Sequence, residues 1–206
     1  MKKYFPLFFF PIFILSCSQN KNNNPAVNSK DTASASEKIN PENTSFIPVT
    51  FLLQSQILML DSLPVTILQV TTINNKQDSA WLPAAKVKPK LQPFISDIID
   101  KDNLARYFKE TKFNDQSTEA ITFMYDPKMA LPDSFSLRRW DVYINPDNGA
   151  LKRVYMIKQA KENNKAVTQQ LTWQSGKWAK MVTIKNEPGT TTQTVNEIKW
   201  IWDLSE

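Results

Sequence analysis

The stretch "SLRRWDVYINPDNGALKRVYMIK" (residues 136–158) decides the fold, because it has the pattern of a β-hairpin. Trp140, Val142 and Ile144 alternate with Arg139, Asp141 and Tyr143, as in a strand with one buried face. The turn is closed either by Asn148-Gly149 alone or by residues 146–149, which pairs Trp140 with Ile157 or with Tyr155. With either turn, we expect the inward face of the second strand to consist of Leu151, Arg153, Tyr155 and Ile157.

Two further turn signals follow this hairpin. In "VTQQLTWQSGKWAKMVTI" (residues 167–184), a two-residue loop of Ser175-Gly176 would place Trp173 opposite Trp178. Pro188-Gly189 then leads into a last strand whose inward positions are Ile198, Trp200, Trp202 and Leu204. The C-terminal part of the chain is therefore predicted to be a five-stranded antiparallel meander.

The N-terminal half of the domain mixes helix and strand signals. Residues 48–62 carry Val49, Leu52, Leu53, Ile57 and Leu60 at helical spacing, and residues 84–96 favour a second helix. Strands are expected over 64–73, turning at Asn74-Asn75, and on both sides of a turn at 114–117. The predicted fold class is α+β: an N-terminal helix packed on a curved antiparallel β-meander of about nine strands, for which a half-barrel is one possible form.

The N-terminus has the pattern of an export signal. Lys2 and Lys3 precede the uncharged segment "FPLFFFPIFIL" (residues 5–15), which is shorter than the roughly 20 residues that a membrane-spanning helix needs. The segment ends in Ile14, Leu15, Ser16 and Cys17, and Cys17 is the only cysteine of the chain. This "ILSC" sequence resembles the lipobox of bacterial lipoproteins. The resemblance implies that residues 1–16 are a signal peptide, which is cleaved, and that Cys17 is acylated.

Residues 18–45 have the composition of a linker, because they are rich in Asn and contain no aromatic residue. We therefore expect residues 17–45 to be the lipidated Cys17 and a disordered tether, and residues 46–206 to be a single α+β domain. Acyl chains on one residue would hold the protein at a membrane. The residue after the cysteine is Ser18 rather than Asp, which among lipoproteins favours the outer membrane over the inner. The expected location is thus the cell envelope.

The layout of the domain resembles two groups of proteins. One group is the uncharacterised outer-membrane lipoproteins of this size. The other is the half-barrel, lipid-carrying fold of the lipoprotein-localisation factors, which is similar in architecture and export signal only. No residue motif allows their binding residues to be transferred to this chain, so this second resemblance is an analogy of fold.

The sequence contains no known catalytic motif. It has no histidine, no cysteine other than Cys17 and only three glycines, which argues against His-activated nucleophiles and glycine-rich phosphate loops. The carboxylates Asp97, Asp100 and Asp102 lack the glycine and the distal glutamate of a calcium loop. We expect no enzymatic activity, no cofactor and no metal, with a carboxylate enzyme as the remaining alternative. The net charge of +5 does not argue for nucleic acid.

Two sets of residues are candidates for binding. The aromatic set could line a ligand site on a curved sheet and consists of Trp140, Trp173, Trp178, Trp200 and Trp202. The basic set could contact an anionic surface and consists of Arg138, Arg139, Lys152 and Arg153, with Lys86, Lys88 and Lys90 as a second group. The expected function is a non-enzymatic binding or structural module, which contacts the membrane through Cys17 and an envelope protein or lipid through its domain. The alternative is a carrier or chaperone for an apolar ligand held on the inner face of the sheet.

Overall fold

The computed structural model describes residues 46–62, 65–99, 106–162 and 165–201. Predictions for residues 1–45, Asp100, Asp102, Trp202 and Leu204 lie outside these ranges. The elements, in chain order, are α1 (Val49–Ser62), β1 (Thr66–Ile73), β2 (Lys76–Trp81), α2 (Ala84–Leu91), the 3-10 turn η1 (Gln92–Phe94), β3 (Phe108–Asp115), β4 (Ala120–Pro127), β5 (Leu137–Ile144), β6 (Leu151–Glu162), β7 (Lys165–Gln174), β8 (Trp178–Glu187) and β9 (Thr190–Ile201).

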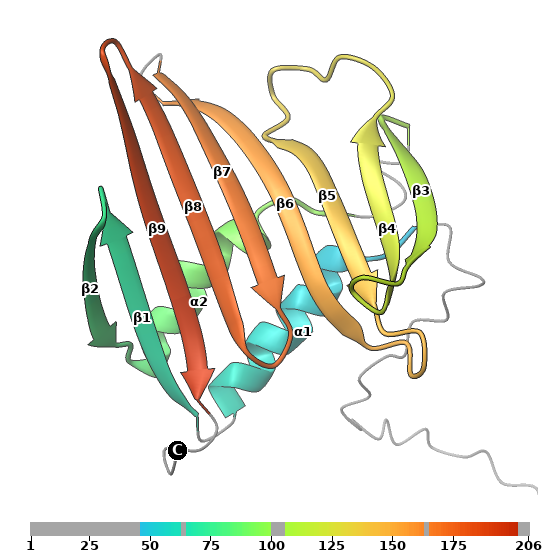
Figure 1. The fold of residues 1–206 in the computed structure, drawn as a ribbon, viewed down its shortest axis with the longest axis horizontal. Coiled ribbons are helices and arrows are strands. Elements are labelled where there is room, and N and C mark those ends of the chain that lie inside the picture. The colour runs from blue at the N-terminus through green and yellow to red at the C-terminus, as the bar shows by residue number, and fades with distance from the viewer. Residues whose placement is uncertain (1–45, 63–64, 100–105, 163–164, 202–206) are drawn as a thin grey trace, which may run out of the picture. The chain divides into compact units, whose positions relative to one another are not determined.

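All nine of these strands belong to one antiparallel sheet, which is curved and not closed (Figure 1). The predicted α+β class, with an N-terminal helix on an antiparallel sheet of about nine strands, is confirmed. The strand order is β2-β1-β9-β8-β7-β6-β5-β4-β3, so that β3 to β9 form a continuous meander. The first hairpin is added beside the last strand, where Ile67 pairs with Trp200. The sequence did not predict this pairing.

Both helices cover the same face of the sheet, which we call the inner face (Figure 1). Of the predicted core positions of α1, Val49, Leu53 and Ile57 are at most 1% exposed and Leu60 is buried, whereas Leu52 is only partly buried. Val87 and Leu91 of α2 and Phe94 of η1 are also buried and belong to the same cluster. The opposite face, which we call the outer face, carries neither helix.

The inward face predicted for β6 is wrong beyond the first pair of the hairpin. Ile144 does pair with Leu151, as the turn over residues 146–149 requires, but Tyr143 then pairs with Arg153. This β-bulge at Lys152 shifts the register by one residue. As a result Trp140 faces Met156, and Val154, Met156 and Lys158 are buried, whereas Arg153, Tyr155 and Ile157 lie on the outer face.

The pairing predicted for Trp173 and Trp178 is also wrong. The N–H of Lys177 donates to the carbonyl of Gln174, so the loop contains three residues instead of two. Trp173 therefore pairs with Ala179, and Trp178 pairs with Gln174. Since neighbouring positions of a strand point to opposite faces, Trp173 is buried on the inner face and Trp178 lies half-buried on the outer face.

Most of the other predicted turns are confirmed. Gly149, Gly176 and Gly189 all have positive φ, as do Asn74 and Asn75 between β1 and β2. The turn expected at residues 114–117 lies two residues later, because β3 continues to Asp115 and β4 begins at Ala120. Asp115 closes that turn by accepting hydrogen bonds from the backbone and hydroxyl of Ser117.

Candidate functional site

The tryptophans on the inner face are part of the core. Trp140 is fully buried and stacks on Tyr125 with 4.5 Å between ring centroids, and the ring of Phe108 meets it edge-on at 4.6 Å. Trp173 packs against Trp200 at 5.1 Å and against Phe94 at 5.6 Å. These contacts fill the space around the three inner tryptophans with protein side chains. Trp178 is on the other face, and Trp202 lies outside the described residues.

One polar contact of this core joins α1 to the β7–β8 hairpin. The indole N–H of Trp173 donates to Oε1 of Gln56, 2.5 Å away, and Nε2 of Gln56 donates to the hydroxyl of Ser175. The indole N–H groups of Trp140 and Trp200 are buried without a hydrogen-bond partner. An unpaired buried N–H costs about 1–3 kcal/mol, so aromatic packing must offset this loss at both residues.

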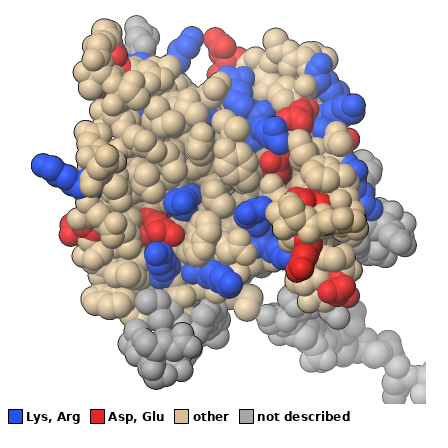
Figure 2. Space-filling model, in the orientation of Figure 1, with Lys and Arg blue, Asp and Glu red and all other residues tan. Residues whose placement is uncertain are grey.

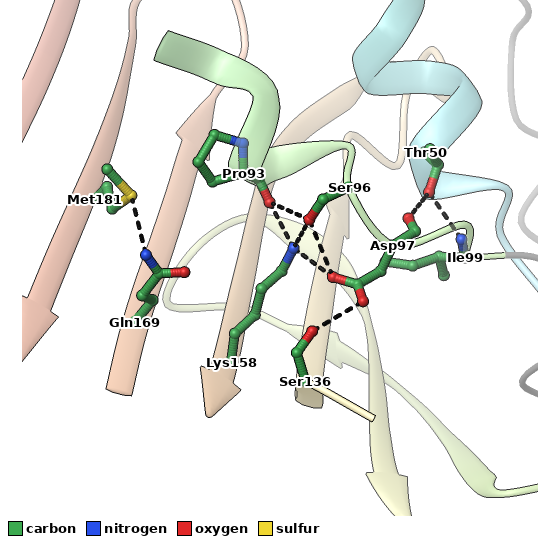
Figure 3. Close-up of polar contacts among 9 residues, drawn as sticks. All are labelled: Thr50, Pro93, Ser96, Asp97, Ile99, Ser136, Lys158, Gln169 and Met181. Atoms are coloured by element: carbon green, nitrogen blue, oxygen red, sulfur yellow. Dashed lines mark hydrogen bonds and ion pairs between the residues drawn. The ribbon is translucent and has the colours of Figure 1, made fainter. Parts of the chain in front are cut away.

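A buried lysine on the inner face connects β6 to the segment after α2 (Figure 3). Lys158 is 4% exposed. Its ammonium group forms an ion pair with Asp97 and donates to the carbonyl of Pro93 at 2.5 Å and to the hydroxyl of Ser96 at 2.8 Å. The second carboxylate oxygen of Asp97 accepts a hydrogen bond from Ser136. All three ammonium protons therefore have acceptors, as a buried charge requires.

The same segment is fastened to the start of α1. The hydroxyl of Thr50 donates to the carbonyl of Asp97 at 2.7 Å and accepts from the N–H of Ile99 at 2.8 Å (Figure 3). Sequence reasoning missed this cluster, because the bulge that turns Lys158 inward has no clear local signal. The cluster has the role of a structural clamp, since every polar group in it is already paired.

A small pocket lies on the inner face between α2 and the strands β1, β8 and β9. It has a volume of about 70 Å³ and is lined by Gln69, Lys90, Phe94, Met181, Asn196 and Ile198, together with Ala179. Nearby, Nε2 of Gln169 donates to the sulfur of Met181 (Figure 3). A volume of this size holds about two water molecules and is far too small for an acyl chain.

The four residues of the predicted basic set separate into different environments. Arg139 binds Asp141 through two hydrogen bonds and lies 3.6 Å from Asp126. The Asp141 carboxyl is buried on the outer face, and this burial raises its pKa, while the hydrogen bonds from Arg139 oppose that shift. Nε of Arg138 is buried without a partner. Arg139 is therefore neutralised within the protein and is a poor candidate for contact with an external anion.

Lys152 and Arg153, in contrast, line a pocket on the outer face. The pocket has a volume of about 230 Å³, and its other lining residues are Thr118, Ala120, Tyr143 and Gln174. The Arg153 guanidinium lies over the Tyr143 ring at 4.1 Å. Nζ of Lys152 donates to the carbonyls of Thr118 and Glu119, which leaves one ammonium proton for a ligand.

The two cations of this pocket form no close ion pair with a carboxylate, although the Asp141 carboxylate attracts Arg153 at longer range. Among the described residues, no Asp or Glu oxygen forms an ion pair with Lys152 or Arg153. In Figure 2, which views the outer face, Lys and Arg side chains lie among Asp and Glu side chains over β4 to β6, whereas the upper surface over β8 and β9 is mostly uncharged. The pocket therefore combines two cations with the amide of Gln174 and the hydroxyl of Tyr143, which are suitable donors for an anion.

Comparisons with known proteins identify no relative from which residue roles could be transferred. No protein-family model matches the chain, and no curated protein matches its sequence. Neither α1 nor α2, the helices of the described residues, combines the length and hydrophobicity needed to cross a bilayer. The described part of the chain also contains no group of three or more His, Cys, Asp or Glu side chains that could share a metal ion.

Proposed function

We propose that this protein is a lipid-anchored, non-enzymatic module of the cell envelope, which binds an anionic group of an envelope component on its outer face. The anchor is the Cys17 of the lipobox-like sequence. The observation that carries the binding role is the pocket of Tyr143, Lys152 and Arg153, where two cations without an ion-pair partner converge. The chemistry of that pocket fits a phosphate or a carboxylate, since an Arg guanidinium binds either group through two parallel hydrogen bonds.

The packing of the inner face supports a binding module over an apolar-ligand carrier. A carrier would need an open cavity beside the inner tryptophans. Trp140 and Trp173 are instead fully buried against Tyr125, Phe94 and Phe108. The space beside these two tryptophans therefore gives no support to the carrier.

The binding role is tested by titrating the full-length protein with inorganic phosphate and with glucuronate, which represent the two anion classes. We expect the NMR signals of the Arg153 and Gln174 side chains to shift in a saturable way with one of these probes. Arg153→Gln should weaken that binding at least tenfold. The matched control is Lys180→Gln, which removes a cation from the outer face outside the pocket and should leave the affinity unchanged. Equal weakening by both variants, or no saturable shift, would refute the pocket.

The anchor has a separate test. The protein isolated from its own cells should begin at residue 17, and the mass of its N-terminal peptide should include two or three acyl chains. A mature protein that begins at Met1, or that carries a bare thiol at Cys17, would refute the anchor.

A further inference from the structure

The outward side of α1 carries three large apolar side chains although it faces water, with the exposed Gln54 among them. Phe51, Leu58 and Met59 are 55%, 57% and 48% exposed. Their spacing of seven and eight residues places them on one side of the helix, opposite the buried Leu53, Ile57 and Leu60. An amphipathic surface helix normally presents polar side chains there, so this stripe needs an explanation beyond the fold.

The two serines of this stripe make it less polar than the sequence suggests. The hydroxyl of Ser55 donates to the carbonyl of Phe51 at 3.0 Å, and the hydroxyl of Ser62 donates to the carbonyl of Leu58 at 3.2 Å. Both hydroxyl protons are thus satisfied by the helix itself and need no water. The stripe can therefore enter an apolar medium without leaving a hydroxyl donor unpaired.

One more exposed apolar side chain lies close to the N-terminal end of α1. Thr50 bonds to the backbone of Asp97 and of Ile99, which holds the intervening Ile98 beside the first turn of the helix. The Ile98 side chain is 64% exposed. We call Phe51, Leu58, Met59 and Ile98 the helix-side patch.

Positive charge is carried by α2, the helix beside α1. The neighbouring α2, "AAKVKPKL", contains three lysines and no acidic residue. Lys86, Lys88 and Lys90 are all exposed, and Lys90 also lines the small pocket on the inner face. Because α1 and α2 cover the same face of the sheet, their outward sides point in the same general direction (Figure 1). An apolar stripe beside lysines is the composition of helices that lie in the interface of an anionic bilayer.

The position of α1 in the chain favours a lipid surface as the partner of this patch. Residues 1–45, which carry Cys17, join the domain at Phe46, three residues before α1 begins. A chain anchored at Cys17 would thus keep α1 close to a lipid surface at high effective concentration. From the patch, the adjacent lysines and this connection, we infer that the domain docks on the membrane through α1 and α2, with the helix-side patch in the headgroup region.

This inference rests on the proposed anchor and extends it. Docking through the inner-face helices would direct the outer face, with the pocket of Lys152 and Arg153, away from the bilayer. The exposed lysines of α2 would make docking depend on anionic lipid and on salt.

The test measures the depth of two probes in the anchored, full-length protein. Leu58→Cys and Phe113→Cys each introduce one thiol that an environment-sensitive fluorophore can label, since an acylated Cys17 does not react. Phe113 is the matched control because it is an exposed aromatic residue (41%) on the outer face of β3. Both proteins are reconstituted in phosphatidylcholine vesicles with and without 30% phosphatidylglycerol.

We expect the probe at position 58 to shift to shorter wavelength and to be quenched by lipid-borne quenchers when phosphatidylglycerol is present, and the probe at 113 to stay in water. The combined variant Lys86→Glu, Lys88→Glu and Lys90→Glu should abolish the shift at 58. Equal emission from both probes in vesicles would overturn the docking, as would a shift at 58 without vesicles, which would indicate a second protein copy on the patch. A protein that does not float with vesicles would refute the anchor itself, and the docking with it.

Discussion

The ammonium group of Lys158 and the carboxylate of Asp97 form an ion pair on the inner face of the sheet, where the lysine is almost completely buried. This contact fastens the segment between η1 and Ile99 to β6 and, through Thr50, to the first turn of α1. The covering of the inner face thus depends on one charge pair in addition to its apolar contacts.

Breaking this pair should destabilise the protein. In Asp97→Asn, the charge of Lys158 would remain buried without its counter-ion, and such losses typically cost 3–5 kcal/mol. Because the Asp97 side chain is 26% exposed, solvent reduces the effect, and we expect a loss of about 2 kcal/mol in the free energy of unfolding measured with urea. Asp133→Asn, which removes the partner of an exposed lysine, Lys161, is the control and should change stability by less than about 0.5 kcal/mol. Equal losses in the two variants would contradict the role of the Lys158–Asp97 pair.

Of the polar residues in the middle turn of α1, we expect only Gln56 to contribute to the stability of the protein. In Gln56→Leu the indole N–H of Trp173 loses its acceptor, and we expect a cost of about 1–3 kcal/mol in chemical denaturation. Gln54→Leu makes the same change at an exposed position of the same helix and should cost little. If both variants unfolded at the same denaturant concentration, the hydrogen bond between Trp173 and Gln56 would make no contribution to stability.

The stability of the protein should respond to pH through Glu110. Burial raises the pKa of this carboxyl above 4.5, while hydrogen bonding to Tyr125 and the nearby Lys112 oppose the shift. A carboxyl with a raised pKa in the folded state stabilises the fold fully below its unfolded pKa, and this contribution is lost as pH rises through the folded value. Glu110→Gln should therefore have a higher melting temperature than the unaltered protein at pH 7 and about the same one below pH 4.5. An unchanged melting temperature at both pH values would show that burial does not control this group.

The β1–β2 turn should tolerate glycine but not a β-branched residue. Asn75 has a φ of 68°, a region that is strained for most side chains. We expect Asn75→Gly to keep or slightly raise the stability, and Asn75→Val to lower it by about 1–3 kcal/mol. Thermal melting followed by circular dichroism is sufficient to distinguish the two variants, and a stable Asn75→Val protein would argue against this turn.

Part of the candidate site could be predicted from the sequence. The sequence indicates Lys152 and Arg153 as neighbouring basic residues of one strand, and in the structure both line one pocket. The other two members of the basic set could not be separated from them in the sequence, because the ion pairs of Arg139 with Asp141 and Asp126 depend on the strand pairing. The Lys158 clamp was missed for the same kind of reason, since a single bulge reverses the face on which every later residue of β6 lies.

The sequence by itself determined the local structure: the helix of residues 49–62, the alternation of Trp140, Val142 and Ile144, and turns at each glycine. These features follow from side-chain periodicity and from backbone conformations that only certain residues adopt without strain, so they can be read from neighbouring positions. Only the tertiary structure decided that β1 pairs with β9, that Trp173 and Trp178 lie on opposite faces and that Lys158 points inward. Such outcomes depend on loop geometry and on contacts between residues far apart in the chain, for which a local pattern contains no information.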